Sequence, residues 1–196
     1  TSSVATLWLA PEIRSFQSSH PGVELQIITL EQDGILGQIN SADIEIFVSD
    51  ETAHGPEVVP LLTATVVPVA APSYLSGRAY HAPADIIGSD LIHITGYRDD
   101  WHRWFHTQGV GDVTIPRGLT VDSSLFAIDA ALRGEGIFLG RRPFLDAHLK
   151  SGELVEVFAK PYHLHAPYFL RQQSGAKHIR NRNQVSAWLK ELANRK

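Results

Sequence analysis

The sequence predicts an α/β fold, and two observations carry this prediction. Segments in which apolar and polar residues alternate take turns with segments in which apolar residues recur every three or four positions. Breakers such as Pro21-Gly22, Gly134 and Gly136 separate these segments. Because strands that alternate with helices usually form βαβ units, we expect mainly parallel sheets.

Each element is expected from its local pattern. Leu9, Ile13 and Phe16 form the apolar stripe of a first helix. Pro11 kinks this helix or begins its second part, and Pro21 follows its end. Strands are expected over residues 23–27, 43–48, 58–70, 91–95, 113–121, 137–139, 154–158 and 163–170, and Pro116 interrupts the fifth of them. Further helices are expected over residues 35–40, 101–105, 142–149 and 185–192. A turn or helix is expected to begin at residue 72, and another helix to begin after Asp122, which would cap it.

The composition narrows the class of protein. The 196 residues are 43% hydrophobic and 19% charged, a balance typical of globular proteins. No stretch has the roughly 18 consecutive apolar residues of a membrane span. Cysteine is absent, which excludes disulfides and thiolate metal ligands. The net charge of −4 argues against a nucleic-acid-binding face, and the absence of methionine leads us to expect a fragment or a processed chain.

Motifs for catalysis or metal binding are weak. His163 and His165 share one face of an expected strand, but no third ligand has a characteristic spacing. The glycines between 134 and 140 follow a helix and precede a strand, the reverse of a dinucleotide-binding loop. Asp43 and Glu45 alternate with apolar residues, as in a strand with one buried face. We therefore expect no catalytic residue, no metal site and no cofactor.

Small hydroxyl residues occur at several junctions between strands and helices. They are Ser2, Ser3 and Thr6 at the first helix, Ser49 after one strand, Thr95 after another, and Ser123 and Ser124 behind Asp122. Helix capping accounts for any one of them. Together they favour a polar ligand cleft, since ligands of open α/β sheets bind beyond the carboxyl ends of strands and against helix N-termini.

Several motifs also follow one another in a characteristic order. They are Ser3-Val4-Ala5-Thr6-Leu7-Trp8-Leu9-Ala10-Pro11, His20-Pro21-Gly22-Val23-Glu24-Leu25, Asp43-Ile44-Glu45-Ile46, Ala71-Pro72-Ser73-Tyr74-Leu75, Asp122-Ser123-Ser124 with Gly134-Glu135-Gly136-Ile137, and the segment 185–192. This order resembles the effector-binding domain of LysR-type transcriptional regulators over nearly the whole chain. The Trp101-x-x-Trp104 pair, with Tyr97-Arg98-Asp99 before it, is similar to the subgroup of glycine-cleavage and β-lactamase activators.

The resemblance implies a fold like that of the type 2 periplasmic binding proteins. Two Rossmann-like lobes would be joined by two crossing strands, with a cleft between the lobes. Lobe I would comprise residues 1–69 plus 169–196, and lobe II residues 70–168. The N-terminal winged helix-turn-helix of the family is absent from this chain.

The resemblance also implies a function and a set of contacts. The chain would sense a small polar or anionic effector in the interlobe cleft and regulate transcription, without enzymatic activity. Ser2 and Ser3 would donate from the first helix start and Thr95 from the opposite lobe. The remaining contacts would be Phe47 and Ser49 on the hinge side and Ser124 at the second helix start.

The partners follow from the same resemblance. We expect a homodimer, in which the helix 11–19 of one subunit packs against the helix 124–133 of the other, and a tetramer for the full-length regulator. DNA would be bound only through the missing N-terminal domain, no membrane would be involved, and the protein would be cytoplasmic. The alternatives are a periplasmic solute-binding protein of the same fold and, less favoured, an enzyme with its active site in the cleft.

Overall fold

The computed structural model describes residues 1–29, 42–49, 55, 57–158, 163–173 and 179–195. Its strands are β1 (Ile44–Val48), β2 (Val58–Ala70), β3 (Leu91–Ile94), β4 (Thr120–Val121), β5 (Ile137–Arg142), β6 (Val155–Glu156) and β7 (Leu164–Gln172). Its α-helices are α1 (Ala10–Ser19), α2 (Pro72–Leu75), α3 (Asp100–Thr107), α4 (Ser124–Leu132), α5 (Asp146–Ser151) and α6 (Ile179–Asn194). A π-helical segment, Val4–Leu9, leads into α1, and 3-10 turns occupy Pro83–Ile86 and Thr95–Tyr97.

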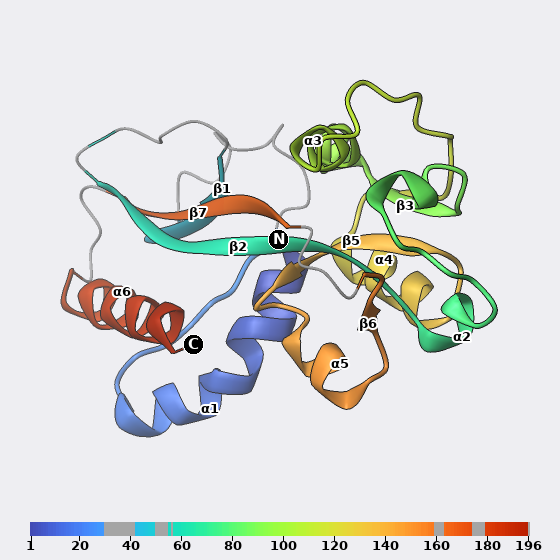
Figure 1. Cartoon of the computed structure of the whole chain (residues 1–196). Coiled ribbons are helices and arrows are strands. Elements are labelled where there is room, and N and C mark those ends of the chain that lie inside the picture. The colour runs from blue at the N-terminus through green and yellow to red at the C-terminus, as the bar shows by residue number, and fades with distance from the viewer. Residues whose placement is uncertain (30–41, 50–54, 56, 159–162, 174–178, 196) are drawn as a thin grey trace.

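One sheet organises the described part of the chain. Its strand order is β1-β7-β2-β5-β3-β4, and β6 also pairs with β2. The long strand β2 extends across the molecule from the helices α1 and α6 to α2 (Figure 1). It pairs with β7 through Val58–Val66 and with β5 through Thr65–Val69. The sheet therefore holds together both ends of the molecule.

The expectation of mainly parallel strands is wrong. The pairs β1–β7, β7–β2, β2–β5 and β2–β6 are antiparallel, and only β5–β3 and β3–β4 are parallel. A parallel pair needs a crossover, which α3 and α4 supply between β3, β4 and β5. The two longest strands, β2 and β7, instead lie antiparallel to each other, so the mixed sheet has its parallel part at one side only.

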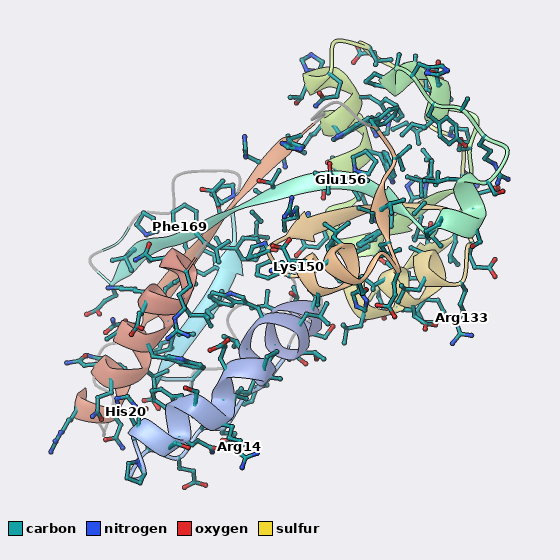
Figure 2. The ribbon with its side chains drawn as sticks, turned by 60° about the horizontal axis from the view of Figure 1, so that its bottom comes forward. Arg14, His20, Arg133, Lys150, Glu156 and Phe169 are labelled. Atoms are coloured by element: carbon teal, nitrogen blue, oxygen red, sulfur yellow. The ribbon has the colours of Figure 1, made fainter. Side chains whose placement is uncertain are left out.

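Two apolar clusters cover the sheet. In the larger one, Phe16 of α1 lies 4.6 Å from Trp188 of α6, measured between ring centroids. Figure 2 shows these two helices side by side, with His20 at the end of α1. In the smaller cluster, Val67 of β2 packs with Ala131 of α4 and Leu145, next to α5. No helix in the described ranges is long and apolar enough to span a membrane.

Several element predictions are confirmed. The strand predicted over 58–70 coincides with β2, and those over 43–48 and 91–95 differ from β1 and β3 by one residue at an end. Leu9, Phe16 and the first helix are also as expected. The π-helical segment ends at Leu9, two residues before Pro11, whose ring cannot donate a backbone hydrogen bond.

Other element predictions are wrong. Residues 23–27 belong to no strand among the described residues. Of the strand predicted over 113–121, only Thr120–Val121 pairs, because Pro116 has no N–H for a ladder. Asp122 does not cap α4; Ser123 occupies the N-cap position. Arg142 belongs to β5, so α5 begins later than expected, and the helix predicted over 35–40 lies outside the described residues.

Candidate ligand-binding site

The carboxyl ends of the three parallel strands meet at one edge of the sheet. In the register, Ile94 of β3 lies opposite Val121 of β4, and Ile92 of β3 lies opposite Phe138 of β5. The chain then continues from β3 into the turn Thr95–Tyr97 and from β4 into α4. In α/β sheets this edge is where ligands bind.

The hydroxyl residues of three distant segments come together at this edge. The Ser2 Oγ lies 3.5 Å from the Ser123 Oγ, which connects the start of the first helix with the start of α4. The Ser3 Oγ lies 3.2 Å from the Thr1 Oγ1. The Thr95 hydroxyl donates to the Val121 carbonyl over 2.9 Å. The structure therefore brings together the segments that carry Ser2, Ser3, Thr95 and Ser124.

These hydroxyls do not cap the helices. Ser3 precedes the π-helical segment and Ser123 precedes α4, yet neither helix start has a side-chain capping hydrogen bond. Ser124 is only 7% exposed, and its hydroxyl makes no hydrogen bond with any residue the structure describes. The capping explanation therefore does not account for Ser124, whose hydroxyl remains able to bind another molecule.

Phe47 and Ser49 lie elsewhere. Both belong to the β1 end of the sheet, and β7, β2 and β5 separate β1 from β3. The Phe47 ring stacks with Phe169 at 5.9 Å, and the Arg171 guanidinium lies 4.6 Å above it. The Ser49 N–H donates to the Pro167 carbonyl over 3.3 Å. These two residues therefore lie against β7, apart from the hydroxyl groups at the edge of β3 and β4.

A buried ionic cluster lies at the same edge as the hydroxyls, and the sequence did not predict it. Arg141, near the carboxyl end of β5, forms an ion pair with Asp100 in the first turn of α3. Its guanidinium carbon lies 3.9 Å from the centre of the Tyr97 ring. The Arg141 Nε is buried and has no acceptor among the described residues. A donor left unsatisfied in this way costs about 1–3 kcal/mol.

Tyr168 of β7 completes this cluster. Burial raises the pKa of Tyr168 well above its ordinary value, although the Arg141 charge opposes the shift. The phenol is therefore neutral at physiological pH and remains a hydrogen-bond donor. Its ring packs edge-on against Phe144 at 5.1 Å, and Phe144 contacts Trp8 at 6.0 Å. An aromatic path thus connects the first helix with the strand β7.

Sequence signals for this cluster are faint. Tyr97 follows Thr95 by two residues, and Arg141 is the first charge after an apolar strand. The pairing of Arg141 with Asp100 spans 41 residues, which no local pattern predicts.

The two strand histidines do not form a metal site in the described part of the chain. The His163 Nε2 lies 4.0 Å from a Glu156 oxygen, and no third metal-binding side chain joins them there. The described residues contain no group of three or more such side chains that could hold a metal ion.

Comparison with known proteins identifies the class that this fold and site define. A family profile described as the LysR substrate binding domain matches residues 1–194. The chain belongs to this family, and its fold is of the type 2 periplasmic-binding-protein kind.

Curated relatives include transcriptional activators. The glycine cleavage system transcriptional activator of Escherichia coli strain K12 is 26% identical over 156 residues, which cover 78% of this chain and 50% of the relative. The activator AmpR of Pseudomonas aeruginosa is 27% identical over 194 residues, which cover 95% of this chain and 62% of the relative. The chain thus spans between half and two thirds of the length of these relatives.

Solved structures share the fold. The effector domain of Pseudomonas aeruginosa AmpR has a TM-score of 0.79 at 26% identity, covering 97% of this chain and 91% of that one. CrgA of Neisseria meningitidis, a LysR-type regulator, has a TM-score of 0.80 at 19% identity, covering 98% of this chain and 66% of that one. The second likeness concerns the fold alone.

Proposed function

We propose that this chain is the effector-sensing domain of a bacterial, cytoplasmic LysR-type transcriptional regulator. A small polar or anionic molecule binds beside the hydroxyl groups and is not chemically changed. The family membership and the relatives named as transcriptional activators support this proposal.

The observation that carries the proposal is the contact between Ser2 and Ser123. Their hydroxyls lie 3.5 Å apart although they are 121 residues apart in sequence. We assign residues 1–69 and 169–196 to one lobe and 70–168 to the other, with β2 and β7 crossing between them. A ligand that bonds to Ser2 and Ser3 on one side and to Thr95 and Ser124 on the other stabilises one lobe arrangement, and signalling requires such a difference.

Phe47 and Ser49 are assigned the hinge side of the same cleft. Both lie where β1 pairs with β7, and the backbone contact of Ser49 with Pro167 is one residue from Tyr168. This part of the proposal places a ligand's apolar portion near the Phe47 ring.

A second copy of the chain is the proposed partner. On α4, Phe126 is 58% exposed. Asp129 follows Phe126 by about one helical turn and Arg133 by about two, and these two residues form an exposed ion pair. On α1, Arg14 is exposed, and Figure 2 shows Arg14 and Arg133 on the outside of the ribbon. We propose an antiparallel dimer of α1 against α4, a tetramer for the full-length regulator, and DNA binding through an N-terminal winged helix-turn-helix outside this chain.

A thermal-shift screen of small metabolites tests the proposed function. A ligand that binds only the folded chain raises its melting temperature. We expect a metabolite that stabilises the wild type and the control Ser76→Ala, but not Ser3→Ala or Ser124→Ala. Equal stabilisation of all four proteins would contradict the proposed contacts, and turnover of the metabolite would indicate an enzyme.

A further inference from the structure

We propose that Arg141 is the anion-binding group of this site, so that the ligand carries a carboxylate or a similar anionic oxygen. The inference rests on the proposed function and adds the chemical class of the ligand. Arg141 has the position that such a role needs, because it lies near the carboxyl end of β5, beside the ends of β3 and β4.

The guanidinium is oriented by its neighbours. Asp100 binds one terminal nitrogen, and the Tyr97 ring lies 3.9 Å from the guanidinium carbon. Arg141 is 8% exposed, so its side chain has little freedom to turn. The Nε–H therefore keeps one direction, and no described residue accepts its hydrogen bond.

The carboxylate that pairs with Arg141 also faces a second arginine. Asp100 also lies 3.9 Å from Arg103, so one carboxylate faces two guanidinium groups. The pair of Arg171 with Glu45 differs, because these two residues lie directly opposite each other in the register. Asp100 thus leaves Arg141 able to attract a second anion.

Two neutral side chains that carry a hydroxyl group also lie near Arg141. The Ser124 hydroxyl can donate, and the phenol of Tyr168 keeps its proton. A carboxylate is an acceptor with two oxygens and forms charge-assisted hydrogen bonds with a guanidinium. Hydroxyl donors beside a buried guanidinium favour this ligand over the corresponding amide, which would bring its own donors. Because the Nε is buried, the ligand reaches it only when the surrounding elements separate.

Nitrogen-15 NMR of the arginine side chains tests the inference, with formate as the probe and formamide as its neutral control. The Arg141 signal is identified by its loss in Arg141→Lys, which keeps the positive charge but has no Nε. We expect formate to shift the Arg141 Nε–H signal saturably, both in the wild type and in the surface control Arg133→Lys. We expect formamide to leave the signal in place. A formate effect no larger than that of formamide, or than that of sodium chloride at equal ionic strength, would overturn the inference.

A binding measurement separates this inference from the proposed function. With a carboxylate found in the metabolite screen, Arg141→Lys should bind at least about tenfold more weakly than the wild type, while its affinity for the matching amide should not change. If Ser124→Ala weakens binding but Arg141→Lys does not, the sensor function stands and the anion site is wrong. If formate shifts the Arg141 signal saturably, but Ser3→Ala and Ser124→Ala weaken the binding of no metabolite, the anion site stands and the proposed contacts are wrong.

Discussion

Two of the molecule's arginine–carboxylate pairs, one at each side of the sheet, differ in their surroundings. Arg141 and Asp100, at the parallel side, have side chains only 9% and 11% exposed. Arg171 and Glu45, at the antiparallel side, are 39% and 25% exposed. Each guanidinium lies over an aromatic ring, Tyr97 in the first pair and Phe47 in the second.

The difference follows from how the two pairs arise. Glu45 and Arg171 are cross-strand neighbours on β1 and β7, so the strand register alone brings them together. Asp100 and Arg141 come from a helix and a strand that meet only when α3 packs over the sheet. A pair made by register can remain half-exposed, whereas a pair made by packing is removed from water and becomes sensitive to the loss of either partner.

The largest effect is expected when the buried pair is broken. Asp100→Ala leaves the Arg141 charge buried without its carboxylate, which should lower the free energy of unfolding by about 3–5 kcal/mol. Urea denaturation at pH 7 measures this loss. The double variant with Arg141→Met should recover most of it, because no uncompensated charge remains. If Asp100→Ala lowered the free energy of unfolding by less than about 1 kcal/mol, the pair of Arg141 with Asp100 would be as well solvated as the pair of Arg171 with Glu45.

A smaller effect is expected from crowding the parallel side without changing a charge. A Cβ at Gly118 would lie 2.2 Å from the Leu91 backbone oxygen, so β3 or its neighbouring loop must move. Gly118→Ala should cost about 1–3 kcal/mol, the usual range for overpacking. Gly88→Ala is the matched control, since a Cβ there meets nothing within 4 Å. Similar stabilities of the two variants by thermal denaturation would show that the loop adjusts freely.

Acid should destabilise the parallel side through His93. Burial lowers the pKa of His93 below its ordinary value, and the nearby His102 acts in the same direction, while the hydrogen bond to the Pro116 backbone opposes them. The unfolded chain therefore takes up the proton first, so stability should fall as the pH drops from about 6.5 through the lower folded-state pKa. Denaturation at several pH values should show this fall in the wild type and less of it in His93→Gln. An equal fall in both proteins would assign it to other groups.

The smallest effect is expected at the half-exposed pair. Glu45→Ala removes the partner of Arg171, yet water can solvate the remaining charge, so the free energy of unfolding should fall by less than about 1 kcal/mol. The loss should shrink further in high salt, because ions screen exposed charges. If Glu45→Ala were as destabilising as Asp100→Ala, exposure would not be what distinguishes the two pairs.

Local sequence patterns predicted much of the fold and part of the candidate site. The apolar run 58–70 coincides with β2 because a long buried strand has few competing interpretations. Ser3, Thr95 and Ser124 were singled out because they follow strands or begin helices, and these junctions share one edge of the sheet. The segment 113–121 was expected to be a strand interrupted at Pro116, but only Thr120–Val121 pairs, and the alternating pattern does not reveal the close approach of Gly118 to the Leu91 backbone.

By itself, the sequence determined the succession of helices and strands and the positions of the hydroxyl residues, since both depend on neighbours within a few residues. Only the tertiary structure decided that β2 and β7 pair antiparallel and that Arg141 is buried against Asp100 with its Nε left without an acceptor. The physical reason is that burial and ion pairing depend on which distant segments exclude water together, and the spacing of residues along the chain does not record that.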